Sequence, residues 1–180
     1  MRVIAGSARG VPLAAPRGRS VRPIADRVKE TMFGILAERV IDARVLDLYA
    51  GSGAIGIEAL SRGAAHCTFV ERGREALSVL RRNLDRTGLD GLADVRGGDV
   101  MRFLEMADAS AYDLAFLDPP YAERAILPPL QRLLPRLAPG AMVVVKHFWR
   151  TEVPEVNGLA SWRTRRFGET GLSFLQREES

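Results

Sequence analysis

The sequence has very little cysteine and histidine. Cys67 is the only cysteine in the chain, which excludes an internal disulfide. His66 and His147 are the only histidines, and one cysteine with two histidines makes no convincing zinc site. We therefore expect a protein of a reducing compartment that holds no metal.

Long apolar runs are also absent. The longest one covers residues 141–145, far short of a membrane span, and the start of the chain contains no apolar signal segment. With 47% apolar and 27% charged residues, the chain fits one soluble globular domain that can bury a full core. The sequence thus predicts a cytoplasmic protein without a membrane partner.

Lysine is nearly absent, although the chain is basic. Of 26 basic residues only Lys29 and Lys146 are lysines, so 24 are arginines, the residue best suited to bidentate phosphate contacts. Residues 1–30 hold seven basic and two acidic side chains, a net charge of +5. This local excess predicts a polyanionic partner at a basic N-terminal arm, residues 1–23, which belongs to the same domain as residues 24–180. A high-GC genome, which favours arginine codons, is the alternative explanation for the ratio.

Short apolar runs alternate with amphipathic stretches along the rest of the chain, which predicts a parallel sheet covered by helices on both faces. Two final strands around Gly168–Gly171 predict an antiparallel hairpin, and we assign Trp149 and Trp162 to packing in this region. The predicted helices are 24–40, 54–61, 74–87, 100–106 and 128–137, and the predicted strands are 44–50, 66–71, 93–96, 113–117, 141–147, 161–167 and 172–177.

A glycine-rich loop follows the first predicted strand. Residues 51–56 read GSGAIG, and Glu71 stands at the end of the second predicted strand, at the spacing of a dinucleotide-binding fingerprint. Such glycines let the backbone approach a ligand closely, and the acid can accept both hydroxyls of a ribose. The pattern suits NAD as well as S-adenosylmethionine, and a turn needed only for strand–helix packing is a further alternative.

Two other acids favour S-adenosylmethionine. Asp47 lies in the first strand, shortly before Gly51, where it would face the methionine ammonium, and NAD offers no cation there. Asp99 follows the third strand, where its carboxylate can accept the adenine amino group. Asp99 is equally well placed to cap the helix that begins at Val100.

A second loop, Asp118-Pro119-Pro120-Tyr121, directly follows the strand 113–117. The two prolines stiffen the loop and cannot donate hydrogen bonds, so the loop presents the Asp118 carboxylate and the Pro119 carbonyl as acceptors beside an aromatic ring. Such a surface suits a planar amino group, with Tyr121 stacked on the base that carries it. A capped helix N-terminus would explain the aspartate and prolines but not the tyrosine.

Together, DLYAGSGAIGIEALSRGA and FLDPPY resemble class I S-adenosylmethionine-dependent methyltransferases that act on amino groups. The opening MRVIAGSARGVPLAAP, RPIADRVKETMF at Arg22–Phe33 and RRFGETGLSFL at Arg165–Leu175 are similar to the bacterial RsmD family, and the similarity covers nearly the whole chain. The resemblance implies methylation of a guanine N2 in small-subunit (16S) rRNA. The sequence departs from the family pattern at Ile24, Ala25 and Lys146.

The resemblance implies a Rossmann-like α/β fold with a mostly parallel seven-stranded sheet, a C-terminal antiparallel hairpin and helices on both faces. It also implies a monomer that binds 16S rRNA within the assembling small ribosomal subunit and releases S-adenosylhomocysteine. The expected catalytic residues are Asp118, Pro119, Pro120 and Tyr121; the cofactor-binding residues are Asp47, Ala50, Gly51, Gly53, Glu71, Asp99, Val100 and Arg22; and the RNA-binding residues are Arg2, Arg9, Arg17, Arg19 and Arg27.

Three other functions stay open at this point. A methyltransferase that acts on adenine N6 in DNA or RNA would use the same DPPY chemistry on another base, although so short a chain has no separate domain for reading a duplex sequence. An NAD-linked oxidoreductase would need a hydride-transfer partner that DPPY does not supply. A non-catalytic RNA-binding or assembly factor would not depend on Asp118.

Overall fold

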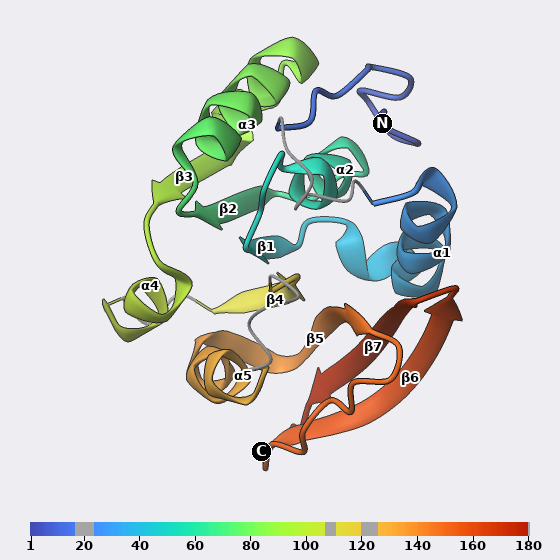
Figure 1. Cartoon of the computed structure of the whole chain (residues 1–180), viewed down its shortest axis with the longest axis vertical. Coiled ribbons are helices and arrows are strands. Elements are labelled where there is room, and N and C mark those ends of the chain that lie inside the picture. The colour runs from blue at the N-terminus through green and yellow to red at the C-terminus, as the bar shows by residue number, and fades with distance from the viewer. Residues whose placement is uncertain (17–23, 107–110, 120–125, 180) are drawn as a thin grey trace.

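A seven-stranded sheet forms the centre of the structure, a computed structural model that describes residues 1–16, 24–106, 111–119 and 126–179 (Figure 1). The strand order is β3-β2-β1-β4-β5-β7-β6. The strands are β1 (Arg44–Leu48), β2 (His66–Glu71), β3 (Ala93–Gly97), β4 (Tyr112–Leu117), β5 (Leu137–Phe148), β6 (Leu159–Phe167) and β7 (Thr170–Arg177).

Strands β1 to β5 are paired in parallel, whereas β7 is antiparallel to both β5 and β6. The chain builds the sheet outward from β1 in one direction and from β4 in the other, so the strand order reverses between these two neighbours. In open α/β sheets, ligands bind outside the carboxyl ends of the strands at such a reversal. The topology thus selects the carboxyl ends of β1 and β4 as the place to look for a site.

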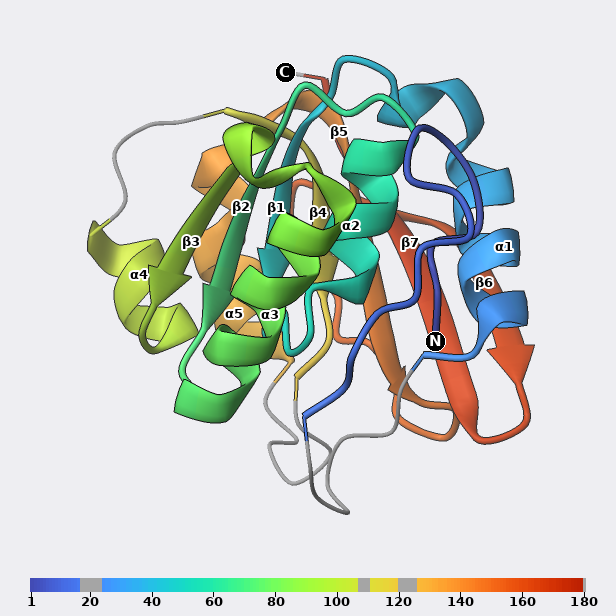
Figure 2. The same cartoon turned by 90° about the horizontal axis from the view of Figure 1, so that it is seen from above.

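Helices cover both faces of the sheet (Figures 1 and 2). Apolar side chains of α1, α2 and α3 belong to one buried cluster, and those of α4 and α5 to the other. Because the central strands are covered on both faces, β1 and β4 are almost entirely buried, as is typical of parallel sheets. The helices are α1 (Asp26–Leu36), α2 (Ala54–Ser61), α3 (Arg74–Thr87), α4 (Val100–Met106) and α5 (Leu127–Leu133).

The opening segment, residues 1–16, lies against α1, α2 and α3 (Figure 2). Gly6 has φ +86°, and a Cβ atom there would lie 1.6 Å from the Ser61 carbonyl oxygen, so the contact with α2 admits only glycine. Asn83 of α3 holds Ala14 through two hydrogen bonds, of 2.9 and 3.0 Å. The opening segment is therefore part of the folded domain.

A charged network lies beneath this segment. The Lys29 ammonium of α1 is 3.2 Å from a Glu58 carboxylate oxygen of α2, and both side chains are fully buried. Glu58 also accepts the backbone N–H groups of Ile4 and Ala5, at 2.8 and 3.0 Å, and the Arg62 guanidinium at 2.8 Å. Because buried charges are costly unless they are paired and hydrogen-bonded, this network explains how α2 tolerates a glutamate on its covered side.

The predicted fold class is confirmed, and most predicted elements lie within a few positions of the observed ones. Two helices are shorter than predicted. The first ends at Leu36 and continues as a 3₁₀ turn to Val40. The fifth ends at Leu133 and is followed by a 3₁₀ turn that contains Pro135, because proline supplies no N–H group for a helix interior.

The strand predicted at 141–147 begins earlier, at Leu137, since Leu137 pairs with Tyr112 before an irregularity in the register. Cys67 is fully buried on β2, as expected of a packing residue. Within the described parts of the chain, no helix is both long enough and apolar enough to span a membrane.

Candidate active site

A cavity of about 550 Å³ lies at the carboxyl ends of β1, β2 and β4. It is lined by residues from the glycine loop, from the ends of β2 and β3 and from the loop after β4. Eight of the predicted site residues line it: Asp47, Ala50, Gly51, Glu71, Asp99, Val100, Asp118 and Pro119. Segments that are far apart in sequence therefore meet at the predicted edge of the sheet.

The glycine loop is fixed by Glu71. One oxygen of the Glu71 carboxylate accepts the Gly51 N–H at 2.8 Å, and the other accepts the Gly73 N–H at 2.7 Å. Both bonds fix the carboxylate at the cavity wall. Since each carboxylate oxygen can accept a second hydrogen bond, Glu71 retains acceptor sites for a ligand.

Gly53, a predicted cofactor residue of the glycine loop, does not line this cavity. Its φ is +78°, and a Cβ atom there would lie 2.0 Å from the Cδ1 atom of Leu80 on α3. Gly53 therefore serves the close packing of the loop against α3, which is the alternative that the sequence pattern left open for its glycines.

Asp47 lies at the inner wall of the cavity and is only 1% exposed. Its carboxylate accepts the Gly56 N–H at 3.0 Å. Burial raises the pKa of Asp47 from 3.8 to about 7; the bond from Gly56 opposes the shift, and the charges of Asp118 and Glu71 add to it. Because burial disfavours the ionised form of Asp47, a ligand with a positive charge beside it would stabilise the carboxylate.

Asp118 follows β4 and is paired with Lys146 of β5. The register aligns Leu117 with Val145, so the next residues on the two strands, Asp118 and Lys146, stand level at the sheet edge. The Lys146 ammonium donates to the Asp118 carboxylate at 2.7 Å. Burial raises the pKa of Asp118, and the charge and hydrogen bond of Lys146 act in the opposite direction.

Lys146 is a cavity residue that sequence reasoning did not identify. It stood out only as a departure from a family pattern, and nothing local to residue 146 indicates a carboxylate partner. Knowledge that β5 lies beside β4 in parallel would have supplied the signal, because the residues that follow neighbouring strands meet at one edge.

Asp99 combines the two roles that the sequence left open. Its side chain accepts the Arg102 N–H at 3.1 Å, as a capping residue of α4 does, and it also lines the cavity. Val100, the first residue of α4, is buried against the same cavity.

The predicted RNA-binding arginines are spread over the surface. Arg2 is exposed and donates to Asp26 at 3.2 Å, and Arg9 is exposed on the segment that covers α2. Arg27 is exposed on the first turn of α1 and lines a second pocket. The remaining predicted residues, Arg17, Arg19, Arg22, Pro120 and Tyr121, lie outside the described residues.

Residues 1–176 match the family model described as Conserved hypothetical protein 95. The chain belongs to this family, the RsmD family. A relative from Escherichia coli strain K12, "Ribosomal RNA small subunit methyltransferase D", is 37% identical over 184 residues, which cover 99% of this chain and 90% of the relative.

Solved structures agree with this membership of the RsmD family. One from Escherichia coli has a TM-score of 0.89 and 35% identity, and the match covers 100% of this chain and 99% of the other. An RNA methyltransferase from Salinibacter ruber, solved with S-adenosyl-L-homocysteine, has a TM-score of 0.68 and 23% identity over 88% of this chain and 95% of the other. The fold is that of class I methyltransferases.

Proposed function

We propose that this RsmD-family protein transfers a methyl group from S-adenosylmethionine to the N2 amine of a guanine in small-subunit (16S) rRNA. The observation that carries the proposal is the position of Asp118 and Pro119 on the wall of the cavity that Asp47 and Glu71 also line. An acceptor-rich loop beside an adenosine-type site is the arrangement that methyl transfer to an amine requires. The names of the rRNA methyltransferase relatives support rRNA as the substrate.

The described residues fit S-adenosylmethionine. Asp47 would hold the methionine ammonium, whose positive charge would stabilise a carboxylate that burial otherwise disfavours. Glu71 would accept the ribose hydroxyls through its remaining acceptor sites, and Asp99 would accept the adenine amino group. Among the described residues, no group of three or more His, Cys, Asp or Glu side chains is arranged to hold a metal ion.

Asp118 and Pro119 would orient the target amine. The Asp118 carboxylate and the Pro119 carbonyl would accept its two hydrogens, which shifts the nitrogen toward tetrahedral geometry and directs its lone pair at the methyl group. S-adenosylmethionine supplies that methyl group on a sulfonium. Transfer forms the N–C bond, breaks the S–C bond and leaves S-adenosylhomocysteine; the amine becomes acidic after transfer, so its proton can pass to Asp118 without a strong base.

Lys146 would keep Asp118 ready for this role. Burial alone favours the protonated carboxyl, which has lost one acceptor position, whereas the Lys146 ammonium at 2.7 Å favours the carboxylate. The pair thus favours the carboxylate form, in which the loop keeps its acceptor positions. We propose further that the protein acts as a monomer in the cytoplasm on rRNA of the assembling small subunit, whose shape would supply selectivity.

Nucleoside mapping tests this function. The protein would be incubated with methyl-labelled S-adenosylmethionine and small ribosomal subunits from a bacterial strain that lacks its own family member. The rRNA would then be digested to nucleosides and separated. We expect the label in N2-methylguanosine; label in N6-methyladenosine would replace guanine by adenine as the target, and no label in any nucleoside, for subunits or free rRNA, would refute the proposal.

A further inference from the structure

A second pocket lies beside the candidate active site. It has a volume of about 670 Å³ and is formed by the start of α1 and by the turn between β6 and β7, residues 166–170. Ile24 and Lys146 line both this pocket and the cofactor cavity. Because Lys146 also holds Asp118, a ligand in the second pocket lies next to the group that would accept the target amine.

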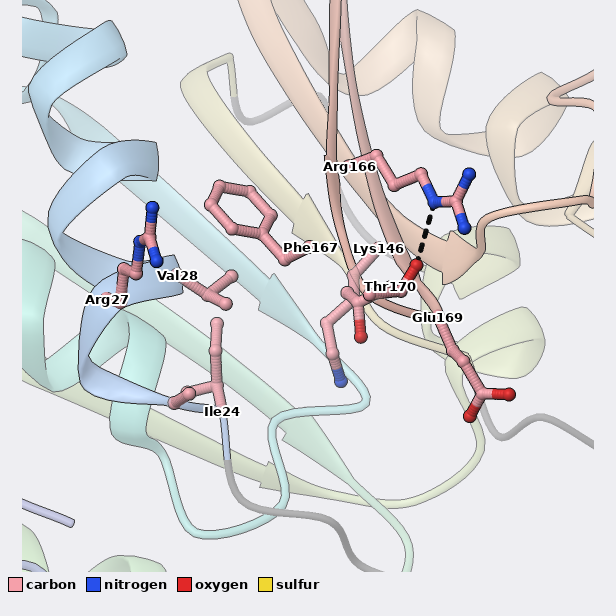
Figure 3. Close-up of a pocket in the computed structure, with 10 residues that line it drawn as sticks. Ile24, Arg27, Val28, Lys146, Arg166, Phe167, Glu169 and Thr170 are labelled. Atoms are coloured by element: carbon pink, nitrogen blue, oxygen red, sulfur yellow. Dashed lines mark hydrogen bonds between the residues drawn. The ribbon is translucent and has the colours of Figure 1, made fainter.

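The pocket has an apolar side. Figure 3 shows Ile24, Val28 and Phe167 grouped on the side nearest α1, with Lys146 and Thr170 facing them. Ile24 and Val28 are buried and Phe167 is half-buried. Apolar and aromatic surface of this kind accepts the face of an unstacked nucleic-acid base.

Two arginines belong to the pocket lining, one beside the apolar side on α1 and one behind the β6–β7 turn. Arg27 is exposed at one margin, and its guanidinium makes no hydrogen bond or ion pair with any residue that the structure describes (Figure 3). Figure 3 shows the Arg166 side chain on the side of the β6–β7 turn that faces away from Phe167. It donates to the Gly168 carbonyl at 2.8 Å, and its guanidinium carbon lies 3.6 Å from the centroid of the Trp149 ring. These contacts hold Arg166 in a fixed orientation, so less side-chain entropy is lost when it binds a phosphate.

The basic margin continues along the edge strand β6. Residues 160–166 are all exposed, and they include Arg163 and Arg165 besides Arg166. Trp162 is 42% exposed, with the Arg163 guanidinium carbon 4.9 Å from its ring centroid. The tryptophans assigned to packing therefore also support arginines on an open edge, and Glu169 adds an acidic side chain to the pocket lining. The phosphates of a nucleic-acid strand complement the basic charge, and its bases complement the apolar side.

We propose that this pocket binds an unpaired nucleotide next to the one that is methylated, with its base against Phe167 and a phosphate toward Arg27, and that the adjoining RNA backbone crosses the β6–β7 turn to reach Arg166. The inference deepens the proposed function, on which it rests for the nature of the partner. The sequence predicted the main RNA contact at the N-terminal arm, whereas this inference places it at the pocket between α1 and the β6–β7 turn. Arg27, one of the predicted RNA-binding residues, belongs to this surface.

Site-specific crosslinking tests the location. A photoreactive benzophenone amino acid would replace Thr170 in the pocket or, as a control, exposed Arg81 on α3, which lies on another part of the molecule (Figure 1). Each full-length variant would be irradiated with unmethylated small ribosomal subunits. We expect the probe at position 170 to crosslink to rRNA within a few nucleotides of the methylated position, and the probe at position 81 not to crosslink there.

Charge reversal supplies an independent measurement. Arg27→Glu and Arg166→Glu should each raise the KM for small subunits at least tenfold and leave the Kd for S-adenosylhomocysteine within twofold of wild type. Arg82→Glu, on exposed α3 surface, should change neither constant by more than twofold. A failure of Arg166→Glu to fold would be visible in its thermal melt, and the Arg27→Glu result would then decide.

The outcomes separate the two proposals. Crosslinks from residue 170 to ribosomal protein alone, or unchanged KM values for the folded variants, would overturn the nucleotide pocket while methyl transfer still stood. Conversely, rRNA crosslinks from residue 170 without methylation of any guanine would support the pocket and reject the proposed reaction.

Discussion

The two lysines of this chain each pair with a carboxylate, but the surroundings of the two pairs differ. Lys29 and Glu58 are fully buried, and Glu58 accepts two further backbone N–H groups and the Arg62 guanidinium. The Lys146–Asp118 pair lies on a cavity wall and is partly exposed, with side-chain exposures of 11% and 29%.

This difference leads us to treat the first pair as structural and to propose the second as functional. Four donors surround Glu58, so its negative charge is well satisfied within the fold. At the cavity, burial raises the pKa values of Asp118 and Asp47, and the charge of Asp118 adds to the shift at Asp47. Perturbed carboxyl groups that share one cavity are typical of sites whose charge balance is completed by a ligand.

The largest expected effect comes from breaking the functional pair on its acidic side. Asp118→Ala removes the carboxylate that would accept an amine hydrogen, so we expect turnover to fall about 10²–10³-fold, or about 3–4 kcal/mol of transition-state stabilisation. Single-turnover assays with saturating small subunits would measure it. The Kd for S-adenosylhomocysteine should stay within about threefold of wild type, and unchanged methyl transfer would contradict the role of Asp118.

Breaking the structural pair should affect stability instead. Lys29→Met keeps most of the side-chain volume but leaves the buried Glu58 without its ammonium partner, so we expect a loss of about 3 kcal/mol in the free energy of unfolding. Urea denaturation followed by circular dichroism would measure this loss. Lys146→Met serves as the matched variant, because its pair is partly exposed; an equal loss in both variants would contradict the distinction between the pairs.

Asp47→Asn should weaken binding of S-adenosylhomocysteine, whose ammonium needs a carboxylate. We expect about a tenfold loss at pH 8, from the removal of a charge-assisted hydrogen bond. The wild-type affinity should fall as the pH drops below about 7, because Asp47 is then protonated, whereas the asparagine variant should be much less sensitive to pH. Calorimetric titration between pH 6 and 8 would measure both effects; equal pH dependence would exclude Asp47 as the titrating group.

Asp47→Asn also tests how much the Asp47 carboxylate lowers the stability of the ligand-free protein. Because folding raises the pKa of Asp47, the folded state binds its proton more tightly, and this residue lowers stability as the pH rises from about 4 to 7. Asp47→Asn should therefore raise the Tm at pH 8 in the absence of ligand and change it less at pH 4. A lower Tm at pH 8 would contradict the raised pKa.

The smallest expected effect is on the pH profile of Lys146→Met. The Lys146 ammonium lowers the pKa of Asp118, so its loss should shift the acidic limb of kcat/KM to higher pH. Lys146→Arg keeps the charge and should preserve most of the profile. An acidic limb that stays in place would show that Lys146 does not control Asp118.

The sequence predicted that most of the candidate cofactor residues would lie together, because their signals are local. Glycine spacing, an acid inside the first strand and another at the end of the second all lie at strand ends, so they reach one cavity once the strands are parallel. The pairing of Lys146 with Asp118 was not predictable in this way, because it depends on the adjacency and register of β4 and β5.

The packing of the opening segment against the helices could not be predicted from the sequence either. Its anchors, Glu58 and Asn83, are far away in sequence from the backbone groups that they bind, and the sequence shows only an arginine-rich opening. Composition therefore predicted the basic charge of this segment but not its packing against the helices. The role of Gly53 was not predictable for the same reason, because the atom that excludes a side chain at this position belongs to Leu80 on another helix.

Met1 and Pro16 of the opening segment both line the candidate cofactor cavity. Met1 is thus part of the wall of the candidate site, on a segment that Glu58 holds through Ile4 and Ala5. This position matters for laboratory handling, because an affinity tag fused ahead of Met1 would begin at the cavity itself. Proteins for binding measurements should carry the tag after residue 180, or have an N-terminal tag cleaved completely, so that ligand and tag do not compete for the same space.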